Sequence, residues 1–205
     1  LSFGAGFYAG ARLELAGDAD SSWNLVGDVV VSGSGALRMH GNRTLIGRYD
    51  CPIVVANDCV ADVTTGTAFN GPSVVEAGGR LRLPGAQSLT LSNRLDNYGT
   101  IELGSRQGYD VLKISGSGRL VNAGLITVYA QSTVIGGTAL LRAPVEVRAG
   151  GRLWVQDNAS VSMDRGELRN AGVLELGTGS GLGISTPGTR VVALAGSQML
   201  GTGTL

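Results

Sequence analysis

The chain has 205 residues, of which 43% are hydrophobic, 5% are aromatic and 34 are glycine. This hydrophobic content excludes a disordered chain, and the glycines lack the strict period of three that collagen requires. The 16 basic and 16 acidic side chains cancel, which argues against nucleic acids and anionic membranes as partners, because both need a basic face. No run of 18 or more apolar residues is present, so no segment of the sequence is predicted to span a membrane.

The N-terminal quarter contains the first of a series of short, related phrases. The phrase at 10–15 (Gly-Ala-Arg-Leu-Glu-Leu) recurs at 35–39 (Gly-Ala-Leu-Arg-Met), so that Gly10 and Gly35 open two copies of one unit. Apolar runs such as 29–31, bounded by Gly, Asn, Asp and Ser, predict short β-strands.

Residues 42–72 interrupt this rhythm. They contain two of the five prolines and both cysteines, Cys51 and Cys59, but no clear repeat phrase. The segment predicts a loop inserted from one coil and pinned by a Cys51–Cys59 disulfide, in an oxidising compartment. Two free thiols are the alternative. A zinc site is not expected, because His40 is the only histidine and no second cysteine pair exists.

The period returns after residue 75. Three phrases, 97–103, 122–128 and 170–176, begin with Asn-X-Gly. The first two are separated by about 24 residues and the last two by about twice that spacing, which indicates a repeat architecture. Apolar and charged residues alternate within the phrases, as in Leu174-Glu175-Leu176, which predicts strands with one apolar and one charged face. No convincing period of 3.6 residues is present, so almost no helix is expected.

These features predict an all-β fold, a right-handed, single-stranded parallel β-helix of roughly eight coils with about 24 residues each. Asn97, Asn122 and Asn170 would stack as a partial amide ladder at one corner. The glycine two residues after each asparagine would serve a corner that needs a positive φ. An antiparallel sandwich is the alternative, but it requires tight hairpins, and only Asn70-Gly71 offers a suitable Asn-Gly turn.

The phrases at 97–103, 118–128 and 166–176 resemble the repeats of filamentous-haemagglutinin-like adhesins and autotransporter passengers, and are similar to other pectin-lyase-like surface proteins. The likeness covers most of residues 75–205 and, weakly, residues 1–40. It implies a secreted, extended rod used in adhesion or surface assembly. Such bacterial proteins usually avoid cysteine, so the cysteine pair departs from the pattern.

No catalytic, metal or cofactor site is expected. A glycosidase needs two carboxyl groups about 5–10 Å apart. Only Asp18 and Asp20 are close neighbours, and they lie in a serine-rich turn where aspartate favours bonds to its own backbone. His40 is expected to be a surface or locally satisfied residue, because no nucleophile motif accompanies it. The candidate carboxylates considered are Asp18, Asp20, Asp50, Asp58, Asp62, Asp110, Asp157 and Asp164.

Three aromatic residues are candidate contacts. Trp154 occupies the outward position where Glu or Arg stands in related phrases, and with Tyr98 and Tyr129 it is predicted to form a surface that stacks on a sugar or anchors a partner. Packing of Trp154 against a neighbouring arginine is the alternative. Asn42 and Asn158 fit the N-glycosylation sequon, which would be used only in a eukaryotic secretory host.

The sequence therefore predicts a non-catalytic structural or adhesive segment of a secreted or cell-surface protein, serving as a rigid rod and interaction surface. Residues 1–205 are expected to be one β-helix segment of a longer chain. The expected partners are other coils or domains of that chain and a host or matrix protein or glycan, with filament assembly as an option. The alternatives are a pectin-lyase-like carbohydrate-active enzyme and a carbohydrate-binding module.

Overall fold

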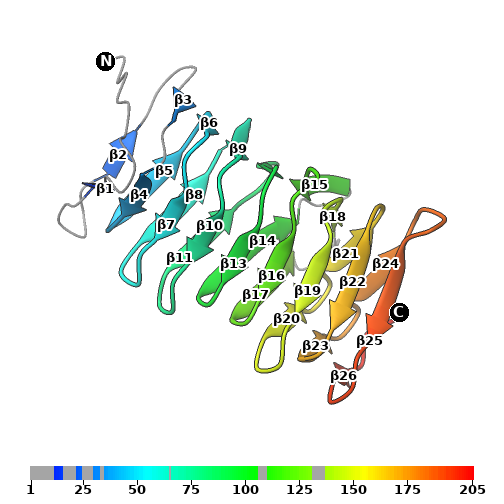
Figure 1. Ribbon diagram of the computed structural model, residues 1–205. Coiled ribbons are helices and arrows are strands. Elements are labelled where there is room, and N and C mark those ends of the chain that lie inside the picture. The colour runs from blue at the N-terminus through cyan, green and yellow to red at the C-terminus, as the bar shows by residue number, and fades with distance from the viewer. Residues whose placement is uncertain are drawn as a thin grey trace.

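The computed structural model describes residues 12–15, 22–24, 30–32, 35–64, 66–105, 110–130 and 137–205. Within these residues the chain forms strands and turns without a helix. The strands wind as successive coils along one axis, from the N-terminal to the C-terminal end of the stack (Figure 1). Paired strands run parallel. The structure thus confirms the predicted parallel β-helix and excludes the antiparallel sandwich.

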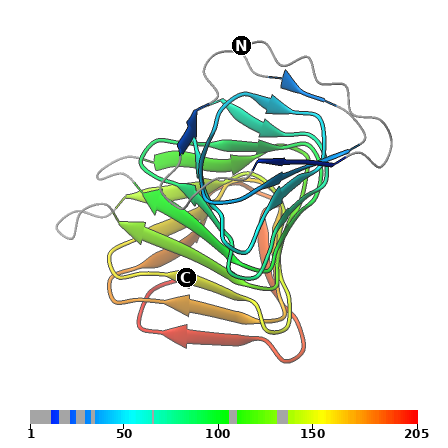
Figure 2. The ribbon, with the colours of Figure 1, turned by 90° about the vertical axis from the view of Figure 1, so that its left-hand side faces the viewer.

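Three sheets form the walls of the solenoid, and each coil contributes one strand to each wall (Figure 2). The first sheet contains, in spatial order, β1 (Arg12–Leu15), β4 (Ala36–Met39), β7 (Ile53–Val55), β10 (Ser73–Val75), β13 (Leu95–Asn97), β16 (Leu120–Asn122), β19 (Val145–Val147), β22 (Glu167–Asn170) and β25 (Arg190–Ala193). The second sheet contains β2 (Ser22–Asn24), β5 (Asn42–Leu45), β8 (Val60–Val63), β11 (Arg80–Leu83), β14 (Thr100–Ser105), β17 (Leu125–Ala130), β20 (Arg152–Val155), β23 (Val173–Leu176) and β26 (Gln198–Gly201). The third sheet contains β3 (Val30–Val31), β6 (Arg48–Tyr49), β9 (Thr67–Phe69), β12 (Leu89–Leu91), β15 (Asp110–Ser115), β18 (Thr138–Leu141), β21 (Ser160–Met163) and β24 (Gly181–Ile184).

One hydrophobic core fills the space between the three sheets. In most strands the residues alternate between this core and the outer surface, as the alternation of apolar and charged residues predicted. Leu103, Val128 and Leu176 lie in one column of stacked positions, and all three are buried. Burial of each such side chain stabilises the fold by about 1.5–3 kcal/mol. The apolar side chains therefore favour the strand register that buries them.

Coils of unequal length stack in this register. The coil that leads from Leu37 to its partner Ile53 is much shorter than the coil that leads from Leu95 to its partner Leu120. The average is about 22 residues per turn, slightly below the predicted 24. Among the described residues the first and second sheets have nine strands each and the third has eight, in line with the roughly eight coils expected.

The loop predicted at residues 42–72 is wrong. This segment forms β5 to β9, which pair in register with the strands before and after them. The repeat was not recognised there because these coils are short, as the pairing of Asn42 with Val60 shows. Pro52 and Pro72 each stand immediately before a strand of the first sheet, a position that proline tolerates because it needs no ladder hydrogen bond there.

The glycines of the Asn-X-Gly phrases are required for close approach and not for their φ angle. Gly99, Gly124 and Gly172 are not among the described glycines with positive φ, which corrects the sequence-based reason. A Cβ atom on Gly124 would lie 2.3 Å from the carbonyl oxygen of Gly99 in the preceding coil, and one on Gly172 would lie 2.2 Å from the carbonyl oxygen of Gly151. The corner between the first and second sheets therefore packs backbone directly on backbone.

Candidate functional site

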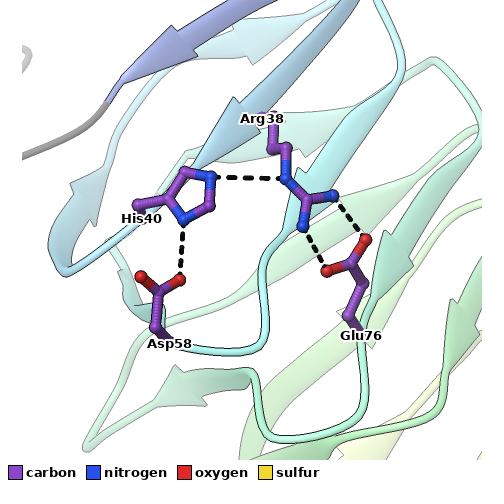
Figure 3. A network of polar contacts seen from close by, with 4 residues as sticks. All are labelled: Arg38, His40, Asp58 and Glu76. Atoms are coloured by element: carbon purple, nitrogen blue, oxygen red, sulfur yellow. Dashed lines mark hydrogen bonds and ion pairs between the residues drawn. The ribbon is translucent and has the colours of Figure 1, made fainter.

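Four charged or polar side chains meet at the corner between the first and second sheets, near the N-terminal end of the stack (Figure 3). Arg38 belongs to β4 and His40 follows it, while Asp58 lies in the turn after β7 and Glu76 in the turn after β10. These turns belong to consecutive coils, and stacking brings together side chains that are distant in sequence. Sequence reasoning weighed His40 and Asp58 separately and did not join them.

The hydrogen bonds within this corner network fix the tautomer of the histidine. Arg38 donates two N–H bonds to the carboxylate of Glu76, one of them from Nη2 to Oε2 at 2.6 Å. Arg38 Nε also lies 3.3 Å from His40 Nε2, and a guanidinium can only donate. His40 Nε2 is therefore the acceptor, so the ring proton is on Nδ1 and points to Asp58 Oδ1 at 2.8 Å.

The network joins coils and does not prepare a proton transfer. The hydrogen bond from Arg38 lowers the pKa of Glu76, and the same bond raises the pKa of Arg38. A histidine–aspartate pair is the base of a catalytic triad, but the nitrogen of His40 that would accept a proton is occupied by Arg38. None of the described serine, threonine or cysteine side chains hydrogen-bonds to the ring.

Metal ligation is not supported by the described part of the chain. No group of three or more His, Cys, Asp or Glu side chains is arranged there to hold an ion. Asp18 and Asp20 lie outside the described residues. Asp50, Asp62 and Asp164 are each bound to an arginine side chain, so these carboxylates are not gathered into one cluster.

The predicted disulfide is also wrong, because Cys51 and Cys59 are both buried free thiols. Cys51 precedes β7 and Cys59 follows it, and an extended strand of three residues spans about 10 Å. A disulfide needs Cα atoms within about 7 Å. Proximity in sequence misled the prediction, since β7 separates the two cysteines before the chain turns at 57–58. Burial raises the pKa of both thiols, to about 12 for Cys59, so they are protonated near neutral pH.

Asn97, Asn122 and Asn170 lie in one buried column at the corner between the first and second sheets. Asn97 Nδ2 donates to Asn122 Oδ1 at 2.7 Å, and Asn122 Nδ2 donates to the carbonyl of Arg152 at 2.9 Å. Val147 occupies the position between Asn122 and Asn170, so the amide ladder is interrupted after its first rung.

The three candidate aromatic residues lie on the second sheet and on its corner with the first. Trp154 faces outward from β20, and the guanidinium carbon of Arg152 lies 5.0 Å from its ring centroid. Tyr129 on the neighbouring β17 covers Gly104, where a Cβ atom would lie 3.1 Å from the tyrosine hydroxyl. Tyr98 lies in the turn after β13 and is 49% exposed. Trp154 and Tyr129 therefore share the second sheet, while Tyr98 belongs to its corner with the first.

Both sequon asparagines are exposed. Asn42 is the first residue of β5. Asn158 lies in the turn before β21 and has a φ of 59°, a conformation that asparagine tolerates better than most residues. Each position is accessible enough to accept a glycan, and the use of either sequon stays a prediction.

Sequence reasoning missed a buried lysine. Lys113 lies at a register shift in β15 and is fully buried. Its Nζ donates to the carbonyl oxygens of Leu83 at 3.2 Å and Gln87 at 3.4 Å, and also to that of Gly85. Burial lowers its pKa to about 8. The signal was present in the phrase 111–114, Val-Leu-Lys-Ile, whose apolar residues break the strict alternation of a strand.

The comparisons with known proteins assign no family to the chain. No family model matches the chain, and no curated protein or solved structure is significantly similar to it. The part of the chain that the structure describes holds no helix long and apolar enough to cross a membrane. The established description is accordingly a parallel β-solenoid built from repeats.

Proposed function

We propose that this chain is a non-catalytic segment of a secreted or cell-surface protein, in which the solenoid serves as a rigid rod and its outer faces serve as interaction surfaces. The observation that carries the proposal is the distribution of the outward carboxylates. Most of the described ones are paired with arginines along and across the coils instead of converging on one groove. The pairs include Arg82–Asp62, Arg94–Asp96, Arg142–Asp164 and Arg152–Glu175.

Rigidity follows from the way in which the coils are joined. Every coil is hydrogen-bonded to its neighbours through three parallel sheets, and its interior is a continuous apolar column. Each coil contacts mainly the coils next to it, which makes the stack a quasi-one-dimensional object. Such an object holds its two ends at a fixed separation, as a spacer must.

The location outside the cell rests on the resemblance of the repeat phrases to those of surface adhesins. The two free thiols are buried and protonated, so they need no particular redox compartment. The partners in this proposal are further coils or domains of the same polypeptide and a matrix or host glycan or protein.

Three measurements test the proposal. In solution scattering, about eight coils at about 4.8 Å each should give a rod of about 40 Å. In a panel of acidic and neutral polysaccharides, the chain should release no reducing ends and no unsaturated products. Turnover of any polymer that is abolished in Asp58→Ala or Asp164→Ala would refute the non-catalytic assignment. Antibody labelling of intact against permeabilised source cells tests the location separately.

A further inference from the structure

The outer face of the first sheet carries more positive than negative charge between β13 and β22. Because every second residue of a strand faces outward, β16, β19 and β22 with their flanking residues present a grid of side chains. Within this grid the carboxylate of β22, Glu167, is paired with Arg190 on the next strand. Arg119, Arg148 and Arg169 lie around the carboxylate of Glu146. We refer to these four residues as the arginine patch.

The geometry leaves two arginines of this patch without an acidic counterpart of their own. Arg148 Nε lies 3.3 Å from Glu146 Oε1, and Arg119 Nη1 lies 3.6 Å from Glu146 Oε2. Arg169 faces Glu146 in register from the next strand but, among the described residues, has no ion pair within 4 Å. Three positive charges thus share one negative charge.

The second sheet provides the contrast. Its outward charges alternate: Arg82 lies between Asp62 and Glu102, and Arg152 is bound to Glu175. Arg80 also lies 3.5 Å from Glu102, so Arg80 and Arg82 share two carboxylates. The zero net charge of the chain therefore conceals a local excess that is specific to one face.

We propose that the arginine patch binds a linear acidic polysaccharide. A guanidinium presents a planar fork of donors that matches carboxylate and sulfate groups. Tyr98, exposed one coil before the patch begins, offers an aromatic face of the kind that stacks on a sugar ring. This proposal rests on the function proposed above and names the partner of the rod as an acidic glycan.

The existing contacts with Glu146 do not prevent this binding. The side chains of Arg119 and Arg148 are 56% and 41% exposed, and ion pairs that are accessible to water contribute little. A polymer that carries several acidic groups engages the three guanidiniums together. Added salt should weaken this binding, because the contacts are exposed to solvent and are screened.

The experiment measures binding of the folded chain to polygalacturonate and to dextran sulfate by calorimetry, with neutral dextran as the polymer control. Arg148→Ala and Arg169→Ala should each lower the affinity about tenfold, the loss of one charged hydrogen-bonding group. Arg152→Ala is the matched control: its side chain is 42% exposed, against 41% for Arg148, but it lies on the second sheet. It should change the affinity by less than about twofold.

A second variant strengthens the test by predicting a gain. Glu146→Gln frees Arg119 and Arg148 from their shared carboxylate and should raise the affinity for both acidic polymers, whereas Glu175→Gln on the second sheet should not. Equal binding by the native chain, Arg148→Ala and Arg169→Ala overturns the proposal. So does tighter binding to polyglutamate or duplex DNA than to either polysaccharide.

The outcomes also separate this proposal from the function on which it rests. If the acidic polymers are bound and cleaved, the non-catalytic assignment fails while the binding site stands. If they are neither bound nor cleaved, the binding proposal fails and the rod remains. Melting temperatures of all variants within a few degrees of the native value exclude unfolding as the cause of lost binding.

Discussion

Lys113 places an amino group in the interior of the solenoid, where it is fully buried. Three carbonyl oxygens of the 83–87 segment accept hydrogen bonds from its ammonium group. These bonds satisfy the donors but do not replace solvation by bulk water. Burial dominates and lowers the pKa to about 8. The protonation of this one group is therefore linked to folding.

Stability should depend on pH through Lys113 with a definite sign. Below pH 8 the lysine is charged in the folded and unfolded chains, and the full cost of burying the charge is present. Between pH 8 and the ordinary lysine pKa of about 10.4, the unfolded chain binds more protons, so stability rises with pH. Compared with Lys113→Met, the native chain should gain about 2 kcal/mol of unfolding free energy between pH 7 and 9.5.

Urea unfolding of both proteins across this pH range measures the difference. Burial raises the pKa of Cys59 and of Tyr49 to about 12, and these groups reduce stability as pH rises above about 9. They are present in both proteins, so their effect cancels in the comparison. Parallel pH profiles for the two proteins would contradict the prediction.

The thiols give a second prediction at this scale. Because Cys51 and Cys59 are buried and protonated, and the thiolate is the reactive form, a maleimide should modify neither in the folded chain at pH 7. Both should react after denaturation. Mass spectrometry counts the adducts, and a chain whose mass rises by two hydrogens on reduction would show that the thiols are in fact paired.

At the scale of the element, the turn after each strand decides how closely two coils approach. The carbonyl oxygen of Gly99 lies only 2.3 Å from the position that the Cβ atom of any other residue at position 124 would take. Backbone cannot move aside as a flexible side chain can, since each coil is also held by its strands. Glycine at these corners is thus a packing requirement.

Gly124→Ala should therefore destabilise the chain by about 2–3 kcal/mol, as overpacking does. Gly183→Ala is the control, because Gly183 lies on the exposed side of β24 with no atom within 4 Å of the added carbon and no positive φ. That substitution should be neutral or slightly stabilising. Thermal unfolding of both variants measures the difference, and equal midpoints would show that the corner yields.

The same scale explains what the sequence could and could not predict. The alternation in 174–176 and the repeated Asn-X-Gly corners identify the strands, the core-facing side chains and the parallel stacking, because these depend on local periodicity. The hydrogen bond between His40 and Asp58 depends on a coil shorter than the average. A search for one longer, constant period does not identify this coil, so it does not predict the contact. Lys113 was missed for a related reason: a single extra residue in β15 turns its side chain inward.

At the scale of the whole molecule, the last coil differs from the sides of the stack in the apolar side chains that it exposes. Among the described residues, the exposed large hydrophobic side chains include Ile184, Met199, Leu200 and Leu205, which all belong to the last coil. Strands β24, β25 and β26 are the final members of their sheets. β25 and β26 pair on one side, and β24 has only a single bridge to Thr204 on its other side, whereas central strands pair on both sides.

Hydrogen exchange of the 205-residue chain should report this gradient. Backbone amides of 181–184, 190–193 and 198–201 should exchange faster than those of β11, β14 and β17, since local opening costs less where fewer contacts are lost. Mass spectrometry of labelled peptides resolves these segments. Uniform protection along the chain would mean that the stack opens as one cooperative unit.

The unequal coils have a consequence for how such a molecule changes over time. The advance from one coil to the next is fixed at about 4.8 Å by the hydrogen bonds between neighbouring strands. This holds for the short coil that ends at Ile53 and for the long coil that ends at Leu120. The length of the solenoid therefore depends on the number of coils and not on the number of residues in each coil. Insertions and deletions at a corner change the cross-section of the solenoid and its surface side chains, while the distance between its two ends stays the same.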